Sequence, residues 1–311
     1  MIKPQDYRIL IAEDDPAIRA LLAEILAAEG YEVLVAQDGE EAQAILRRNP
    51  CQMLITDIQM PKCDGFTLLK DADVNFPGMQ RIVLTAFNAD EYMDLIQEQG
   101  VGNVIIKSVP FDSTELILLV NQLASHDIFG LDKHLTPGTQ IRSSLIRRSQ
   151  EIEDLSISLS ELYGAANNSN KLRTVLVELL TNAVFYGARN EQGEDKSQWR
   201  KDFTLEKDQA IEVFHGEDEE KIGFAIVDGG GRLSKDTILY WLNRQISPSQ
   251  NGLPVGLFDS HGRGLFIVRK SVDRLQIHVD PGHRCECLII NYKKPVLGRF
   301  KPLRIIELPR Q

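Results

Sequence analysis

The sequence predicts an α/β protein made of two domains, and three observations support this prediction. The 311 residues are about twice the roughly 150 residues of a typical domain. Short apolar runs alternate with helix-like segments over the first 125 residues, which is typical of a doubly wound parallel sheet. Acidic side chains outnumber basic ones about two to one over residues 1–125, whereas the two are balanced over residues 126–311. We therefore expect a domain over 1–125, a linker over 126–139 and a second domain over 140–311.

Five strands and five helices are expected in the first domain. Each strand is a short apolar run, and the runs are Arg8–Ala12, Tyr31–Ala36, Gln52–Ile58, Arg81–Ala86 and Val101–Lys107. The first helix opens at Asp15-Pro16, where the missing proline N–H costs little, and ends at Gly30. The later helices are expected at Glu40–Arg48, Gly65–Val74, Asp90–Gln99 and Ser113–Ala124. This alternation gives a parallel sheet with helices on both faces.

Polar side chains follow four of these strands, at the ends where parallel sheets bind ligands. Glu13 and Asp14 follow the first strand, Asp57 lies in the third, Thr85 ends the fourth and Lys107 ends the fifth. Carboxylates this close repel one another unless a cation joins them, so we expect a hard divalent ion, Mg²⁺. With the ion bound, one carboxylate can attack phosphorus while the metal, the lysine and the hydroxyl neutralise the transferred oxygens.

On these residues the first domain, over residues 6–125, resembles the receiver domains of two-component response regulators, which have a flavodoxin-like fold. The resemblance implies that Asp57 is the phosphoacceptor, that Thr85 is the switch hydroxyl and that Lys107 is the lysine of the site. It also implies an upstream histidine kinase or phosphotransfer protein as the phosphodonor. The metal ligands that it implies are Glu13, Asp14, Asp57 and the backbone carbonyl of Gln59.

Two positions depart from the receiver pattern. Val104 stands where the family has an aromatic residue, three residues before the lysine. In the family a proline directly follows the lysine, whereas here Ser108 and Val109 lie between Lys107 and Pro110. We expect the phosphorylation chemistry to survive both changes, whereas the family's usual signalling route is put in question.

The second domain is expected to mix strands and helices. The expected strands are Gln140–Ile146, Gln209–Phe214 and Lys221–Asp228, the last two forming a hairpin. The expected helices are Glu151–Tyr163, Lys171–Tyr186 and Thr237–Gln245, followed by one that begins near Gly264 and has Leu265, Val268, Val272 and Leu275 on its core face. Residues 190–207 are expected to form an exposed excursion. A Ser-, Pro-, Gly- and Asn-rich segment between Ser247 and Ser260 has the composition of a lid beside a pocket.

Three short motifs in this domain are candidates for a ligand site, and the third of them favours phosphate. Glu178 and Asn182 lie one turn apart on the clearest helix and project away from its apolar stripe. The second hairpin strand ends in Asp228 and a run of three glycines, which lets the backbone approach a ligand closely. Gly262-Arg263-Gly264 opens a helix, whose exposed N–H groups and positive dipole end favour phosphate.

In this order the motifs resemble the Bergerat-type ATPase fold of histidine kinases, gyrase and Hsp90, an α/β sandwich with a mixed sheet. The closest branch is that of the anti-sigma-factor serine kinases. The resemblance implies ATP and Mg²⁺ as ligands, with Asn182 holding the ATP-bound Mg²⁺ and Glu178 acting as the base or positioning a water near the γ-phosphate. It implies that Asp228 accepts from the adenine amino group.

The glycines of the motifs complete the implied nucleotide site. Gly230 would bind the nucleotide, Gly262 and Gly264 would lie along the phosphates, and Arg263 would add charge-assisted hydrogen bonds. Arg232 stands where the family has its second glycine, which puts the affinity for the nucleotide in question.

Two classes of function compete. In the first, the chain is a serine/threonine kinase whose output is set by Asp57 phosphorylation and whose substrate is a sigma-factor-antagonist-like protein. In the second, the ATPase-like domain sequesters a partner without turnover. Loss of transfer with retained binding in Glu178→Ala favours the kinase, whereas a wild type that labels no partner favours the switch.

Other classes find less support in the sequence. A hybrid histidine kinase would need a long helical hairpin around His134-Leu135-Thr136-Pro137, and residues 126–150 leave no room for it. The charge balance gives no nucleic-acid footprint, so no DNA partner is expected. No apolar run is long enough for a membrane span, the four cysteines lack zinc spacing, and a cytoplasmic protein is expected. The sequence leaves a homodimer open.

Overall fold

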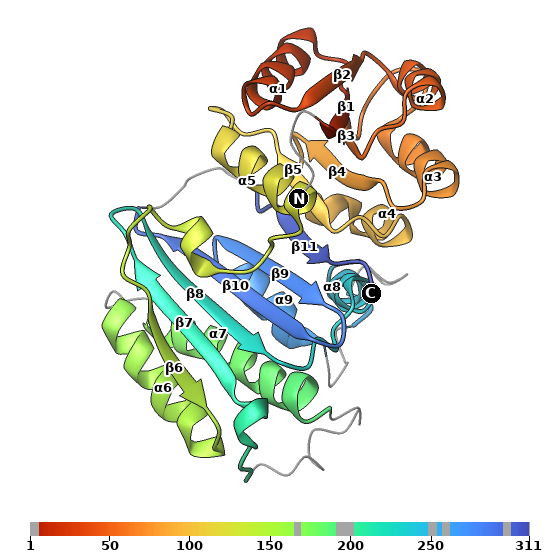
Figure 1. Ribbon diagram of the computed structural model, residues 1–311. Helices are drawn as coiled ribbons and strands as arrows, with labels where there is room; N and C mark the ends of the chain where they lie inside the picture. The colour runs from red at the N-terminus through yellow and green to blue at the C-terminus, as the bar shows by residue number, and fades with distance from the viewer. Residues whose placement is uncertain are drawn as a thin grey trace. The chain divides into compact units, whose positions relative to one another are not determined.

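The computed structural model describes residues 6–164, 169–190, 202–247, 254–256, 262–294 and 300–310. The chain divides into two compact units (Figure 1). Unit 1 comprises Met1–Ile128 with Gly298–Leu303, and unit 2 comprises Phe129–Leu297 with Arg304–Gln311. In the part of the chain that the structure describes, no helix is both long enough and apolar enough to cross a bilayer.

Unit 1 contains a five-stranded parallel sheet. Its strands are β1 (Arg8–Ala12), β2 (Glu32–Ala36), β3 (Met53–Asp57), β4 (Gln80–Thr85) and β5 (Asn103–Ile106). They lie in the order β2-β1-β3-β4-β5, and every neighbouring pair is parallel. The central strands β1 and β3 are almost entirely buried, as expected for a sheet covered on both faces. The predicted doubly wound sheet is confirmed.

Helices cover both faces of this sheet (Figure 1). They are α1 (Pro16–Ala28), α2 (Gly39–Arg48), α3 (Gly65–Asn75), α4 (Met93–Glu98) and α5 (Ser113–Ser125). Aspartates cap the N-termini of α1, α2, α3 and α5, where each accepts backbone N–H groups. The single helix predicted over Asp90–Gln99 is wrong, because the 3₁₀ turn η2 (Ala89–Tyr92) precedes a shorter α4. The Asn88 side chain accepts from Asp90 N–H, which starts the segment as a tight turn.

Unit 2 contains a mixed sheet. Its strands are β6 (Arg142–Ile146), β7 (Ile211–Glu217), β8 (Lys221–Asp228), β9 (Arg274–Asp280), β10 (Arg284–Tyr292) and β11 (Leu303–Glu307). They lie in the order β11-β9-β10-β8-β7-β6. Neighbours are antiparallel except for β9 and β11, which are parallel. The predicted hairpin is β7–β8, whereas β9, β10 and β11 were not predicted.

The helices of unit 2 are α6 (Ser149–Tyr163), α7 (Ser169–Asn182), α8 (Lys235–Ile246) and α9 (Arg263–Ser271). The helix predicted to reach Tyr186 changes to the π-helical segment η4 (Ala183–Ala188) after Asn182. A short 3₁₀ turn, η6 (Lys207–Gln209), precedes β7. The prediction that one helix carries both Leu265 and Leu275 is wrong, because α9 ends at Ser271 and Leu275 lies on β9. Leu265 and Val268 on α9 and Leu275 on β9 are all buried, so the spacing of these apolar residues imitated one helix.

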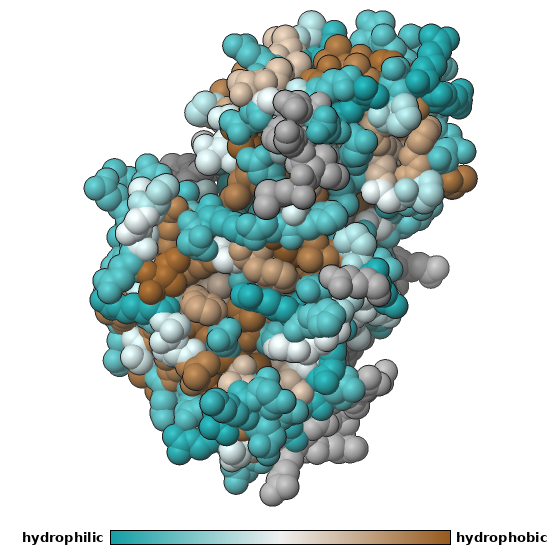
Figure 2. Space-filling view, viewed as in Figure 1, coloured by the Kyte–Doolittle hydropathy of each residue, from teal (hydrophilic) through white to brown (hydrophobic). Residues whose placement is uncertain are grey.

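The sheet face of unit 2 opposite its helices is covered by the chain that enters the unit. The 3₁₀ turn η3 (Leu131–His134) crosses this face in front of the strands (Figure 1). Leu131 and Leu135 form a buried cluster with Ala225, Leu288 and Ile290. Figure 2 shows apolar side chains gathered over this face of unit 2. Part of the segment expected as a linker is therefore packed core.

Candidate functional site

The first candidate site lies at the carboxyl edge of the unit 1 sheet. Lys107 follows β5, and its Nζ lies 2.7 Å from Glu13 Oε2 and 2.8 Å from Asp57 Oδ2. Asp57 ends β3, and its Oδ1 accepts from Ile58 N–H at 2.7 Å. Glu13 is fully buried and Asp57 nearly so. The predicted lysine and two of the predicted acids thus form one buried ion-paired group.

The acids of this site fit a divalent metal. One carboxylate oxygen from each of Glu13, Asp14 and Asp57 lies within 4.8 Å of the others. Burial raises the pKa of Glu13, and the Lys107 ammonium opposes this rise. Three hard oxygen donors at this spacing suit Mg²⁺. Asp14 and Gln59 line a pocket of about 880 Å³ at the same edge, and the role of the Gln59 carbonyl as a metal ligand stays a prediction.

Thr85 connects the site to an aromatic cluster. Its buried Oγ1 accepts from Phe87 N–H at 3.0 Å. The Phe87 ring lies 6.3 Å from the Tyr92 ring, whose centre is 6.1 Å from that of Phe66. Tyr92 Oη accepts from Gln59 Nε2 at 3.2 Å. The sequence reasoning missed Tyr92, because nothing in the chain between β4 and α4 indicates that its ring meets the segment after β3.

Gly65 is a second residue that the sequence reasoning missed. It is the first residue of α3, and a Cβ there would lie 1.9 Å from the Asp57 backbone oxygen. Only glycine lets α3 begin this close to the end of β3. A glycine at the first position of a predicted helix was the available signal.

The second candidate site is built on α7 and η4 of unit 2. Glu178 and Asn182 lie one turn apart on α7, as predicted, but on its last turn rather than in the middle of the helix. The start of α9 lies against them, because a Cβ on Gly264 would come 2.5 Å from Glu178 Oε2 and 3.4 Å from Asn182 Nδ2. Gly262 precedes α9 with φ of 76°, and a Cβ there would meet the Trp241 ring at 2.2 Å. Two of the three predicted motifs therefore meet.

The third motif meets the same segment one turn further on. A Cβ on Gly187, in η4, would lie 2.3 Å from Asp228 Cγ at the end of β8. Asp228 is buried, and its Oδ1 accepts from Gly230 N–H at 2.9 Å and from Gly231 N–H at 3.2 Å. Burial raises the pKa of Asp228 to about 6, against the opposing effect of those two N–H groups.

Two predicted features remain only partly described. Arg263 is the first residue of α9 and is exposed. Most of the lid-like segment, residues 248–253 and 257–261, and residues 191–201 of the predicted excursion lie outside the described residues. His134, which was weighed as the phosphoacceptor of a hybrid histidine kinase, is a buried residue of η3. Its Nδ1 lies 3.4 Å from Gln276 Nε2. Its burial does not suit a phosphoacceptor.

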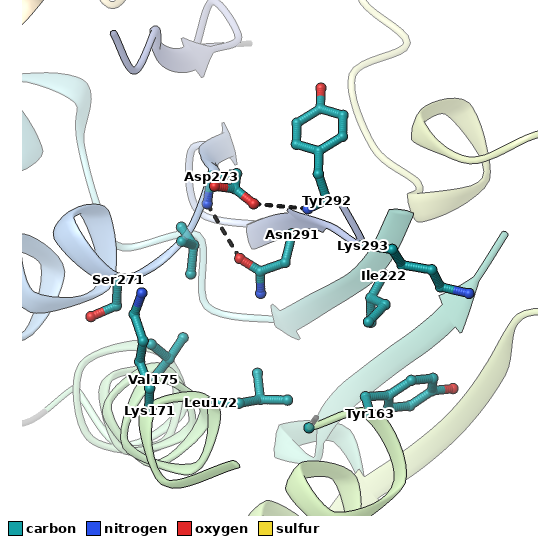
Figure 3. A pocket seen from close by; sticks show the side chains of 12 residues that line it. Tyr163, Lys171, Leu172, Val175, Ile222, Ser271, Asp273, Asn291, Tyr292 and Lys293 are labelled. Carbon is teal, nitrogen blue, oxygen red and sulfur yellow. Dashed lines mark hydrogen bonds between the residues drawn. The ribbon is translucent and has the colours of Figure 1, made fainter. Parts of the chain in front are cut away.

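Unit 2 also has a pocket away from these motifs (Figure 3). It has a volume of about 470 Å³ and is lined by Leu172 and Val175 near the start of α7 and by Ile222 near the start of β8. At its rim Asp273 accepts from Tyr292 N–H at 2.8 Å. Because Glu178 and Asn182 lie at the other end of α7, this pocket is separate from the three motifs.

The fold and acidic site of unit 1 define a class of protein, the phosphorylation-controlled signalling domains with a parallel five-stranded sheet. The family model of the response regulator receiver domain matches residues 9–121. This part of the chain therefore belongs to the response regulator receiver family. The match ends within α5, so unit 2 lies outside it.

Individual relatives agree with this assignment. Response regulator GtcR of Aneurinibacillus migulanus is 38% identical over 109 residues, which are 35% of this chain and 44% of GtcR. Transcriptional regulatory protein GlrR of Escherichia coli strain K12 is 29% identical over 143 residues, 46% of this chain and 32% of GlrR. An uncharacterised 14.6 kDa protein of Leptolyngbya boryana is 36% identical over 116 residues, 37% of this chain and 87% of that protein. The chain spans less than half the length of GtcR and of GlrR.

Solved receiver structures match the same share of the chain. Chemotaxis protein CheY4 of Vibrio cholerae is 25% identical, and the match covers 38% of this chain and 98% of CheY4 with a TM-score of 0.36. TrrA of Thermotoga maritima, solved in complex with Mg²⁺ and BeF, is 35% identical, with coverage of 38% and 98% and a TM-score of 0.34.

Proposed function

We propose that this chain is a response regulator in which phosphorylation of Asp57 controls an ATP-dependent protein serine/threonine kinase formed by unit 2. One observation carries the kinase part: three motifs far apart in the sequence meet along α7 and η4. Gly264 lies against Glu178 and Asn182, and Asp228 lies against Gly187. In the Bergerat fold that the motifs resemble, the same meeting forms the nucleotide site.

The chemistry proposed for unit 1 is phosphoryl transfer to a carboxylate. An Asp57 oxygen forms a bond to the phosphorus of a phosphohistidine, held by an upstream histidine kinase or phosphotransfer protein, while the donor's N–P bond breaks. Mg²⁺ held by Glu13, Asp14 and Asp57 would neutralise the oxygens of the phosphoryl group. Lys107, already 2.8 Å from Asp57, neutralises charge on the same oxygens.

The chemistry proposed for unit 2 is phosphoryl transfer to a hydroxyl. Glu178 takes the proton of an acceptor Ser or Thr as its oxygen attacks the γ-phosphorus of ATP, and ADP leaves. Asn182 would hold the Mg²⁺ bound to ATP, and the N–H groups at Gly262 and Gly264 would receive the phosphates. By the resemblance to anti-sigma-factor kinases, the acceptor is a sigma-factor-antagonist-like protein.

The test of this proposal is transfer of label from ATP to candidate antagonist proteins by the full chain. We expect wild type to bind ATP and to label an acceptor. Glu178→Gln should keep the binding and lose the transfer, and Glu161→Gln on the exposed side of α6 should behave as wild type. A wild type that binds ATP and an antagonist but labels no protein would replace the kinase with a binding switch. A wild type without ATP binding would contradict both.

A matched pair tests the phosphoacceptor independently of unit 2. Asp57→Asn should take up no phosphoryl group from acetyl phosphate, as read by intact mass, because an amide oxygen is a poor nucleophile. Asp71→Asn, at a half-buried residue of α3 whose carboxylate accepts from Asn75 Nδ2, should take up one group as wild type does. Phosphorylation of Asp57→Asn at the wild-type level would place the acceptor elsewhere.

A further inference from the structure

Arg232 replaces a glycine of the Bergerat pattern, and the structure gives its side chain a partner. Arg232 Nη1 donates to the backbone carbonyls of Gly187 and Ala188, at 3.0 Å from the latter. These carbonyls belong to the last two residues of η4. The last carbonyls of a helix lack partners within the helix and carry its negative dipole end, so a guanidinium is a favourable partner for them.

This bond acts at the place where η4 meets the end of β8. Gly187 is the residue whose Cα abuts the Asp228 carboxyl group. Arg232 follows the turn that starts at Asp228, so its side chain ties the two sides of that contact together. Gly230 and Gly231 both donate to Asp228 Oδ1, so these two N–H groups leave Oδ2 for another donor, such as one on a ligand.

We infer that Arg232 is a positioning residue for the nucleotide base. By joining the turn after β8 to the end of η4, it holds Gly187 against Asp228 and fixes Oδ2 for the exocyclic amino group of adenine. This inference rests on the proposed binding of ATP by unit 2. Arg232, which stands where the family has a glycine, thereby has a role of its own in the site.

The charges around Asp228 give the inference a measurable sign. Burial raises the pKa of Asp228 to about 6, whereas the Arg232 charge lowers it. Cys285 is the partner of Asp228 on the neighbouring strand β10, and its own pKa is raised well above the ordinary value, so its thiol stays neutral. An ionised Asp228 accepts best from the amino group. ATP affinity should therefore fall as the pH drops through the pKa of Asp228, and loss of Arg232 should move this midpoint to higher pH.

The experiment compares ATP binding by the full-length wild type, Arg232→Met and Arg232→Lys over a range of pH. Arg232→Met keeps a long side chain without charge or donors, and Arg232→Lys keeps the charge without the planar fork. Arg310→Met, at an exposed residue near the C-terminus, is the matched control. Inosine triphosphate, which has no amino group on the base, is measured alongside ATP. Thermal unfolding of each variant shows that it is folded.

We expect Arg232→Met to bind ATP roughly fivefold more weakly, with a smaller preference for ATP over inosine triphosphate and a higher pH midpoint. Arg232→Lys should keep a midpoint close to wild type, and Arg310→Met should match wild type throughout. Equal losses for both nucleotides with an unmoved midpoint would overturn the inference, because they mark a purely structural role. Unchanged binding in Arg232→Met would overturn it as well. A wild type that binds no ATP would remove the proposed function and this inference together.

Discussion

Single residues in unit 1 are constrained by close approach rather than by chemistry alone. Gly65 carries no reactive group, yet a Cβ on it would overlap the backbone oxygen of Asp57 at 1.9 Å. The neighbour is backbone and cannot turn away, so α3 or the end of β3 must shift. Gly65→Ala should therefore lower the free energy of unfolding of unit 1 by roughly 3 kcal/mol and reduce phosphorylation of Asp57.

Gly78→Ala provides the control for this prediction. Gly78 has φ of +88°, and a Cβ on it would meet nothing within 4 Å. Its replacement should cost only the backbone term, about 1 kcal/mol, and leave phosphorylation unchanged. Urea unfolding and acetyl phosphate labelling measure both effects. Equal costs at the two glycines would show that the overlap at Asp57 is relieved without strain.

Ion pairs on the same unit differ in burial, and this difference predicts a pH dependence. Asp38 caps α2 through Glu41 N–H, and its Oδ2 lies 2.6 Å from Lys62 Nζ. The Lys62 contact, followed by the Glu41 N–H, lowers the pKa of Asp38. Its stabilisation is therefore present above the ordinary aspartate pKa and is lost as the pH falls through the lowered value. Asp38→Asn keeps the cap but loses the charge.

We expect Asp38→Asn to be less stable than wild type near neutral pH, with the difference closing as the solution is made acidic. Glu32→Gln breaks the pair with Arg8, in which the carboxylate is 45% exposed against 3% for Asp38, and it should have a smaller effect near neutral pH, because water screens such a carboxylate. Urea midpoints across the acid range measure both variants. A difference between Asp38→Asn and wild type that widens in acid would contradict the sign.

At the scale of elements, the chain entering unit 2 behaves as part of its core. Leu131 of η3 is 3% exposed, and a Cβ on Gly223 of β8 would lie 2.6 Å from Leu131 Cδ1. Leu131→Ala should lower the stability of unit 2 by roughly 3 kcal/mol, because the cavity lies over a fixed sheet. Leu162→Ala, with 54% of the α6 leucine exposed, should cost about 1 kcal/mol or less. Similar costs for the two would mark Phe129–Leu135 as a loosely held connection.

Elements differ in how far the sequence predicts them, for physical reasons. The strands of unit 1 were predicted to within a residue or two, because they are continuous apolar runs between turn residues. Strands β9 and β10 were missed, because buried polar side chains such as His278 and Glu286 interrupt their apolar pattern. These two side chains contact each other, with Nδ1 of His278 3.1 Å from Glu286 Oε1, and a contact between strands leaves no local signal.

The residues of the candidate sites likewise differ in whether the sequence predicts them. Side chains at strand ends, such as Asp57 and Lys107, were predicted because the topology of a parallel sheet brings those ends together. The approach of Gly65 to β3 and the bond from Arg232 to η4 were not predicted, because each depends on how two elements pack. Sequence order thus indicates which groups meet, and packing decides what each group can do.

At the scale of the whole molecule, the proposed control of unit 2 by unit 1 requires a linkage between two binding events. If a phosphoryl group on Asp57 changes the affinity for ATP by some factor, then ATP changes the affinity for a phosphoryl mimic by the same factor. A complete switch from 1:99 to 99:1 needs about 5.5 kcal/mol, so a partial switch needs less.

The dissociation constant of ATP should therefore differ with and without beryllofluoride and Mg²⁺. That of beryllofluoride should change equally when ATP is added, in wild type and in Asp71→Asn. Asp57→Asn should bind ATP with one affinity under both conditions. A wild type whose affinity for ATP ignores beryllofluoride would show that phosphorylation reaches unit 2 through a step other than nucleotide binding.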